Sequence, residues 1–160
     1  MLFTNSNRKR CSFKGAIQFQ RIIFLMKTPA EIVQLMMQND AFSQWLGVEV
    51  LLIEQGKCSL KCKVKSEMLN GFHIAHGGIS YSLADSSLAF AANSRGQHCV
   101  SVETSISHLG KVSLGDELIS IAKEIYRGKK TGVYEVDIFN QNQRLVAHFK
   151  GTVFVGENQW

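Results

Sequence analysis

The chain has 160 residues, of which 45% are hydrophobic and 19% charged, with a single proline. This predicts one folded domain rather than a disordered chain. No apolar run approaches the roughly 20 residues that a membrane-spanning helix requires, so no membrane association is expected. The formal charge is +5, but residues 1–27 hold six basic and no acidic residues, which leaves 12 Lys and Arg against 13 Asp and Glu. Because that remainder is −1, no nucleic-acid partner is expected.

The four cysteines are Cys11, Cys58, Cys62 and Cys99, and no two of them form a CxxC pair. Cys58 and Cys62 lie on the same face of an alternating segment, which is typical of core residues in a strand. With no signal peptide evident in the sequence, neither a disulfide framework nor a zinc site is expected. We therefore expect a reducing, cytoplasmic location.

A helix is predicted to open the folded domain. Thr28 is a suitable N-cap, Pro29 suits the first helical position, and Glu31 completes a capping box. The apolar spacing continues to about Ser43. We therefore place the folded domain at residues 28–157.

The basic extension that precedes this helix, residues 1–27, has three interpretations. It is a stretch upstream of the true start, since Met26 is itself a suitable initiator, or it is a disordered tail, or it is a transit peptide, because it contains several Arg and no acidic residue. The first two interpretations are favoured over the third.

Strand patterns follow from Gly47 onward. Residues 57–65 alternate strictly between apolar and polar side chains, as in a strand with one buried face. Residues 47–54 precede them across a Gln55-Gly56 turn, so the two segments predict a hairpin. Four more segments with strand character lie at 98–109, 116–126, 132–140 and 143–155.

A different pattern separates the second and third predicted strands. Residues 77–94 are rich in Ala and Ser, contain no Lys or Arg, and are followed by Gly96 as a stop signal. This predicts a helix that is covered on most sides rather than an amphipathic surface helix. One buried helix and about six antiparallel strands predict an α+β domain, in which a curved sheet wraps around the central helix.

Asp85 is the only charged residue in this helix. A buried carboxylate is costly unless it is hydrogen-bonded or paired. Either Asp85 is satisfied by neighbouring serines or by solvent, or it is kept for catalysis. The composition of the helix alone leaves both alternatives open.

The segment before the helix favours catalysis. His76-Gly77-Gly78 opens the helix, and each glycine there costs about 1 kcal/mol relative to alanine. Such glycines let a ligand approach the backbone closely. The unpaired N–H groups of a first helical turn, at the positive end of the helix dipole, suit an oxygen that gains negative charge during acyl transfer. The alternative is a glycine turn that only lets the helix pack tightly.

Other chemistries find less support. His73 and His76 have a His-x-x-His spacing but lie on a loop with no third ligand nearby, so no metal is expected. The sequence contains no Gly-x-Ser-x-Gly elbow, phosphate loop or dinucleotide fingerprint.

Helix geometry predicts that two subunits share each site. Gly77 and Asp85 are eight residues apart on one helix, which is about 12 Å along its axis and about 80° around it. An oxyanion donor must lie about 3 Å from the carbonyl oxygen, while the carboxylate must reach the same carbonyl carbon directly or through one water. One helix cannot meet both requirements, whereas two helices related by a two-fold axis can.

Three elements are recognisable together: Asn70-Gly71, His76-Gly77-Gly78 and Leu83-Ala84-Asp85. They resemble the signature of hotdog-fold acyl-CoA thioesterases, and more specifically the phenylacetic acid degradation thioesterase (PaaI) type. The resemblance covers about 27–155 and includes Gly-Lys-Lys-Thr-Gly-Val-Tyr at 128–134. The His-Gly-Gly element alone is shared by many hotdog enzymes, but the combination is specific.

The resemblance implies a hotdog fold, a homodimer that is often paired further into a tetramer, and a role for each matched residue. Asp85 is the catalytic carboxylate, and the Gly77 N–H polarises the thioester carbonyl. Asn70 positions substrate or water, with His76 beside it. The implied substrate is an aryl-acetyl-CoA, such as phenylacetyl- or hydroxyphenylacetyl-CoA, with coenzyme A as part of the substrate and no separate cofactor.

Further substrate contacts are expected around these residues. Some related thioesterases carry Ser or Thr one turn after the carboxylate, where this chain has Ala89, and Ser86 is a candidate substitute. The phosphates of coenzyme A need cations, and 127–130 is either a basic turn that binds them or a solvated hairpin turn. The candidate substrate-binding residues are Gly78, Ser86, Arg95, Arg127, Lys129, Lys130 and Thr131.

Two mechanisms and two competing functions stay open. Asp85 either activates water as a general base or attacks the thioester carbon to give a mixed anhydride. A hotdog dehydratase acting on hydroxyacyl thioesters would also use a histidine, and a non-catalytic acyl-CoA-binding regulator would not require Asp85. Hydrolysis is favoured because His73 and His76 stand in a thioesterase-like frame.

Overall fold

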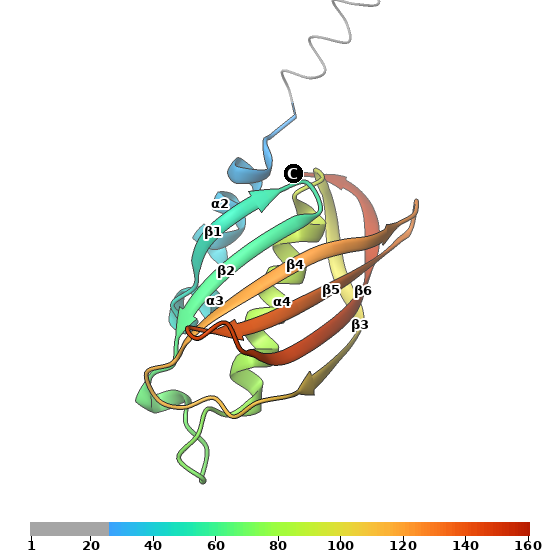
Figure 1. Cartoon of the computed structure of the whole chain (residues 1–160). Helices are drawn as coiled ribbons and strands as arrows, with labels where there is room; N and C mark the ends of the chain where they lie inside the picture. The colour runs from blue at the N-terminus through green and yellow to red at the C-terminus, as the bar shows by residue number, and fades with distance from the viewer. Residues whose placement is uncertain (1–25) are drawn as a thin grey trace, which may run out of the picture.

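The structure is a computed structural model that describes residues 26–160, in which six antiparallel strands curve around one long helix (Figure 1). The helices are α2 (Pro29–Asn39), α3 (Ala41–Leu46) and α4 (Gly77–Asn93). The strands are β1 (Glu49–Glu54), β2 (Lys57–Lys63), β3 (Gln97–His108), β4 (Glu117–Arg127), β5 (Thr131–Asn140) and β6 (Leu145–Gln159). The predicted α+β hotdog architecture is confirmed. The predictions for 1–25 lie outside the described residues.

The N-terminal helix begins as predicted but ends earlier. The Thr28 hydroxyl accepts a hydrogen bond from the Glu31 N–H, and the Thr28 N–H donates to the Glu31 carboxylate at 2.7 Å, which completes the capping box. The helix then stops at Asn39 instead of continuing to Ser43. Asp40 begins α3 by accepting the Ser43 N–H at 2.9 Å. A short acidic side chain that caps a new helix competes with continuation of the preceding one. The prediction of a single helix to Ser43 was therefore wrong, because Asp40 divides the segment into two helices.

The sheet has the order β1-β2-β4-β5-β6-β3, with antiparallel neighbours throughout. All six predicted strands form, and their ends differ from the predicted ends by no more than four residues. The chain crosses from β2 through α4 to β3, which places β3 at the far edge of the sheet. Within the described part of the chain, β3 pairs with β6 alone.

Helix α4 lies in the concave side of the sheet and contacts β2, β3, β4, β5 and β6. Its Ala and Ser side chains are small, so the strands approach its backbone closely. The buried side chains between helix and sheet include Leu83, Leu88, Leu60, Leu118, Ile138 and Phe149. In the described residues no helix is long and apolar enough to cross a membrane.

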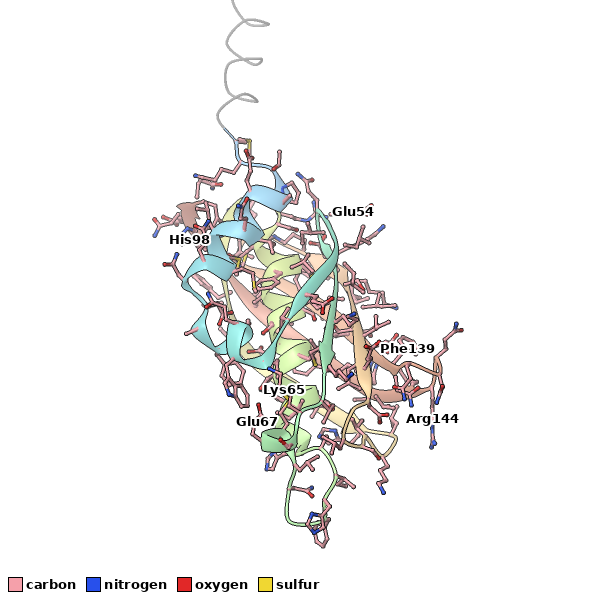
Figure 2. The ribbon with its side chains drawn as sticks, turned by 90° about the vertical axis from the view of Figure 1, so that its left-hand side faces the viewer. Glu54, Lys65, Glu67, His98, Phe139 and Arg144 are labelled. Carbon is pink, nitrogen blue, oxygen red and sulfur yellow. The ribbon has the colours of Figure 1, made fainter. Side chains whose placement is uncertain are left out.

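Helices α2 and α3 pack against α4 on the side that the sheet leaves open, as the turned view in Figure 2 shows. Lys65, labelled in Figure 2, follows β2 and donates from Nζ to the carbonyl of Trp45 in α3 at 3.0 Å. The Oγ atoms of Ser43 and Ser86 are 3.0 Å apart and join α3 to α4. These contacts leave one stripe of α4, beside β3, open to solvent.

Replacing Gly151 of β6 with alanine is expected to destabilise the fold. A Cβ at this position would collide with Leu88 of α4 and press on Phe149 and Thr104. Overpacking of this kind costs about 1–3 kcal/mol. Gly71→Ala is the matched control, because a Cβ there meets nothing within 4 Å and its effect should stay within about 0.5 kcal/mol. Urea denaturation followed by circular dichroism measures both variants, and equal midpoints would contradict the close contact between helix and sheet.

Candidate active site

The open stripe of α4 faces β3 over three successive helical turns. Its members are spaced four residues apart, so they lie on the same side of the helix. Strand β3 runs antiparallel to the helix and turns the matching residues inward, because they pair with buried residues of β6. The three pairs, which we call the α4–β3 ladder, are Gly77–His108, Tyr81–Thr104 and Asp85–Ser101.

Asp85 is half-buried at the inner end of this ladder. Burial raises the pKa of its carboxyl group above the ordinary value, and the Ser101 hydroxyl partly opposes the shift by hydrogen bonding to the charged form. A carboxylate with a raised pKa is a stronger base than a free aspartate. The chemistry predicted for Asp85 therefore has a physical basis at this position.

The hydroxyl group that hydrogen-bonds Asp85 belongs to Ser101, whereas Ser86, the candidate water-orienting residue, lies beside Ser43 of α3. Neighbouring residues of a helix point about 100° apart, so Ser86 faces Ser43 of α3 while Asp85 faces β3. The sequence signal for Ser101 is weak. It follows Cys99 by two positions on the inner face of β3, but nothing local indicates which helical residue it meets.

Two histidine rings explain the two glycines at the start of α4. Nδ1 of His76 accepts the Gly78 N–H at 2.9 Å, and a Cβ on Gly78 would lie 3.0 Å from that nitrogen. A Cβ on Gly77 would lie 3.0 Å from Nε2 of His108. Among residues 26–160 the Gly77 N–H has no hydrogen-bond acceptor, so this donor is available to a ligand.

Asn70 shapes the loop that leads into the helix. Its Oδ1 accepts the N–H of Phe72 at 2.9 Å, and its own N–H donates to the carbonyl of Ile74 at 2.8 Å. This is the local turn that asparagine favours. The His76 N–H then donates to the Met68 carbonyl at 2.9 Å, which fixes the end of the loop. The side-chain oxygen of Asn70 is thus used within the loop, and the predicted role of Asn70 in positioning substrate or water stays a prediction.

Arg95 and Arg127 are used inside the protein. Arg95 donates two hydrogen bonds of 2.7 Å to Glu124 of β4, which also accepts the Tyr134 hydroxyl at 2.7 Å. Burial alone would raise the pKa of Glu124, but these hydrogen bonds hold it below its ordinary value. Arg127 donates to the Ala92 carbonyl at 3.2 Å. Both arginines brace the C-terminal end of α4, which argues against their predicted contact with coenzyme A phosphates.

The other basic residues lie on the surface. Lys129 and Lys130 are exposed in the turn between β4 and β5, and Thr131 is exposed at the first position of β5. Lys130 pairs with Glu157 at 2.8 Å, a surface contact of little energetic weight. Because Arg127 reaches Ala92, the turn lies about 10 Å beyond Asp85 along the axis of α4.

A shallow hollow of about 330 Å³ borders the start of α4 on the side of α3. Phe42 and Trp45 line it from α3, and His76, Gly78 and Ile79 line it from α4 and the preceding residue. The two aromatic rings are 5.7 Å apart, and both side chains are about half exposed. No local sequence pattern predicts this hollow, because its walls come from two helices that are more than 30 residues apart in the chain.

The sequence profile described as "Thioesterase superfamily" matches residues 72–147. Acyl-coenzyme A thioesterase PaaI of Escherichia coli K12 is 39% identical over 116 residues, covering 72% of this chain and 83% of PaaI. The chain belongs to the thioesterase superfamily. The prediction of a PaaI-type hotdog thioesterase is therefore confirmed.

Two solved structures and a further relative also support membership of the thioesterase superfamily. The solved structure of E. coli PaaI, from the phenylacetic acid degradation operon, superposes with a TM-score of 0.80 at 34% identity, covering 82% of this chain and 95% of that one. Human acyl-coenzyme A thioesterase 13 is 28% identical over 130 residues, or 79% of this chain and 93% of that protein. A hypothetical thioesterase of Streptococcus pneumoniae, solved with coenzyme A, has a TM-score of 0.68 at 30% identity, covering 71% and 88% of the two chains.

Replacing Asp85 with Asn is expected to stabilise the fold at neutral pH. Burial raises the folded-state pKa of Asp85, so the stability that this group contributes is present below its unfolded pKa of about 3.8 and is lost as pH rises through the folded value. Asn has a similar shape and no charge to bury. The Tm of the variant should exceed that of the wild type at pH 7, and the difference should shrink as pH falls below about 4.

Thermal denaturation between pH 3.5 and 7 measures this difference. Glu103→Gln, at an exposed carboxylate on β3, is the control and should change Tm little. A wild-type protein more stable than Asp85→Asn at pH 7 would contradict the burial of an unfavourable charge.

Proposed function

We propose that this protein hydrolyses acyl-CoA thioesters to the free acid and coenzyme A, with Asp85 and the Gly77 N–H as the reacting centre. One observation carries the proposal. In this member of the thioesterase superfamily, α4 presents on one open stripe both the half-buried carboxylate of Asp85, whose pKa is raised, and the Gly77 N–H, which has no acceptor in residues 26–160. The relatives PaaI and human thioesterase 13 are named acyl-coenzyme A thioesterases, which supports the reaction class.

In the proposed reaction the Gly77 N–H binds the thioester carbonyl oxygen and stabilises the negative charge that develops on it. Asp85 either removes a proton from water, which then attacks the carbonyl carbon, or attacks that carbon itself to form an anhydride that water hydrolyses. Both routes break the carbon–sulfur bond and release coenzyme A as the thiol. Ser101, beside the carboxylate, orients Asp85 or the water. Neither route requires a metal or a redox cofactor.

The competing functions have less support. A dehydratase finds no support in the names of the relatives, because PaaI and human thioesterase 13 are both named thioesterases. A binding regulator gains nothing from a buried carboxylate whose charge is unfavourable. Hydrolysis is the function that uses Asp85.

We infer that each site is shared by two subunits. Strand β3 is 12 residues long, and its outer edge has no partner strand within residues 26–160. Val100 and Val102 on this strand are 62% and 61% exposed. A long edge strand with exposed apolar residues is a template for pairing with another strand, here the β3 of a second copy. A two-fold axis at this edge would bring the α4 stripes together, so that Gly77 of one copy faces Asp85 of the other.

The acyl group is proposed to be aryl-acetyl and to lie in the hollow lined by Phe42 and Trp45. The hollow lies beside Gly78, one residue from the proposed oxyanion donor, and its volume is at the lower end of the range for ligand pockets. Two exposed aromatic rings favour an aromatic ligand, because ring pairs contribute about 0.5–1.5 kcal/mol beyond their buried area. At the other end of the substrate, Lys129, Lys130 and Thr131 stay candidates for the coenzyme A phosphates.

Two inactive variants are expected to restore activity to each other. Asp85→Asn removes the base. Gly77→Pro removes the N–H at the first helical position, which proline suits, and its Cβ also presses on the His108 ring. His76 has φ −60° and ψ 137°, a conformation that a following proline allows. Each parent should lose at least about 100-fold in kcat, and mixed dimers should regain one working site.

The assay measures thiol release from phenylacetyl-CoA, with circular dichroism and size exclusion to confirm folding and subunit exchange. Absence of any regain in proven mixed dimers would disprove the shared site. If the wild type hydrolysed no ester in a panel of acyl-CoAs, the proposed function itself would be wrong.

Trp45→Ala is expected to raise KM about 3- to 10-fold for phenylacetyl-CoA and to change KM for acetyl-CoA little, because acetyl does not reach the aromatic pair. Ile121→Ala, at an exposed apolar residue of β4, is the control and should leave both values unchanged. Equal effects on both substrates would place the acyl group elsewhere.

A further inference from the structure

His108 ends β3 directly beside the start of α4. A Cβ on Gly77 would lie 3.0 Å from Nε2 and 3.3 Å from Cε1 of His108, so the Nε2 edge of the ring occupies the space of a side chain at position 77. In a helix the Cα–Cβ bond tilts toward the N-terminus, the direction in which the first N–H groups also point. By bond lengths, Nε2 lies within about 6 Å of the Gly77 nitrogen. An oxygen bound to the Gly77 N–H is therefore within reach of this ring.

The ring of His108 is free to act on a ligand. The side chain is exposed, and no hydrogen bond or ion pair to it is found in residues 26–160. Other rings are engaged: His76 accepts the Gly78 N–H, and Nδ1 of His148 lies 2.7 Å from Asp137. His98, labelled in Figure 2, stacks on Trp160 with 4.4 Å between the ring centroids.

We propose that His108 is a catalytic residue that donates a second hydrogen bond, from Nε2–H, to the thioester carbonyl oxygen held by the Gly77 N–H. This inference rests on the proposed function and adds a donor to its oxyanion site. The hydrogen bond strengthens as the oxygen gains charge, so it stabilises the transition state more than the bound substrate. His108 moves no proton in this step, and both the neutral Nε2–H tautomer and the protonated ring can donate.

A purely structural role makes a different prediction. If the ring only filled the space beside Gly77, a phenylalanine of similar size would replace it without loss. If the ring donates a hydrogen bond, phenylalanine fails and a residue with a side-chain N–H restores part of the function. The comparison of His108→Phe with His108→Gln therefore separates packing from donation.

The experiment measures kcat and KM of both variants with phenylacetyl-CoA, and the Kd of free coenzyme A by calorimetry. For His108→Phe, kcat should fall about 10- to 100-fold, which is at or below the loss in kcat that follows removal of one oxyanion-hole donor. KM and the Kd of coenzyme A should change less than about 3-fold. His108→Gln should stay within about 5-fold of the wild type in kcat. His98→Phe, at the other end of the same strand and still able to stack on Trp160, is the control and should be fully active.

The outcomes separate the two proposals. Full activity of His108→Phe, or equal losses in the Phe and Gln variants with unchanged Tm, would overturn the donor role. If that happened while the wild type hydrolysed acyl-CoA and Asp85→Asn did not, the proposed function would stand without this inference. A wild-type protein inactive on every acyl-CoA ester would overturn both.

Discussion

The close packing of α4 into the concave sheet is the constraint on which the rest of the molecule depends. The helix carries Ala, Ser and Gly, and a strand glycine, Gly151, lies against Leu88, so strands and helix approach each other with little intervening volume. The sheet then covers most of the helix, and α2 and α3 cover part of the remainder. The parts of α4 that stay accessible are the stripe beside β3 and the hollow near the start of the helix on the side of α3, so the groups that must meet a ligand are confined to these two surfaces.

This confinement also sets the chemistry. Asp85 is held where burial raises its pKa and a single hydroxyl group, from Ser101, offsets part of that cost. A fully exposed aspartate would be a weaker base, and a fully buried one would be kept protonated and unable to accept a proton. Half-burial of Asp85 at the open stripe raises its basicity while leaving it able to accept a proton. The unfavourable burial of its charge lowers the free energy of unfolding at neutral pH rather than the rate of the reaction.

The sequence predicted the features that depend on local periodicity. The six strands, the buried helix and the Thr28 cap follow from the spacing of side chains within single segments, and all are present. Side-chain contacts between residues that are distant in the sequence were not predicted. Nothing in the sequence links Ser101 to Asp85 or Arg95 to Glu124, because residues 16 and 29 positions apart carry no local signal of their contact.

The glycines of the helix start show how the two kinds of information combine. In sequence they indicated a close approach to a ligand, and the structure shows that each also leaves room for a histidine ring, His76 at Gly78 and His108 at Gly77. The ring at Gly78 uses up a backbone N–H, whereas the ring at Gly77 leaves its N–H free. Positions 77 and 108 are therefore coupled: a side chain at 77 would displace the imidazole, and a smaller residue at 108 would remove the steric reason for glycine while leaving the backbone donor unchanged.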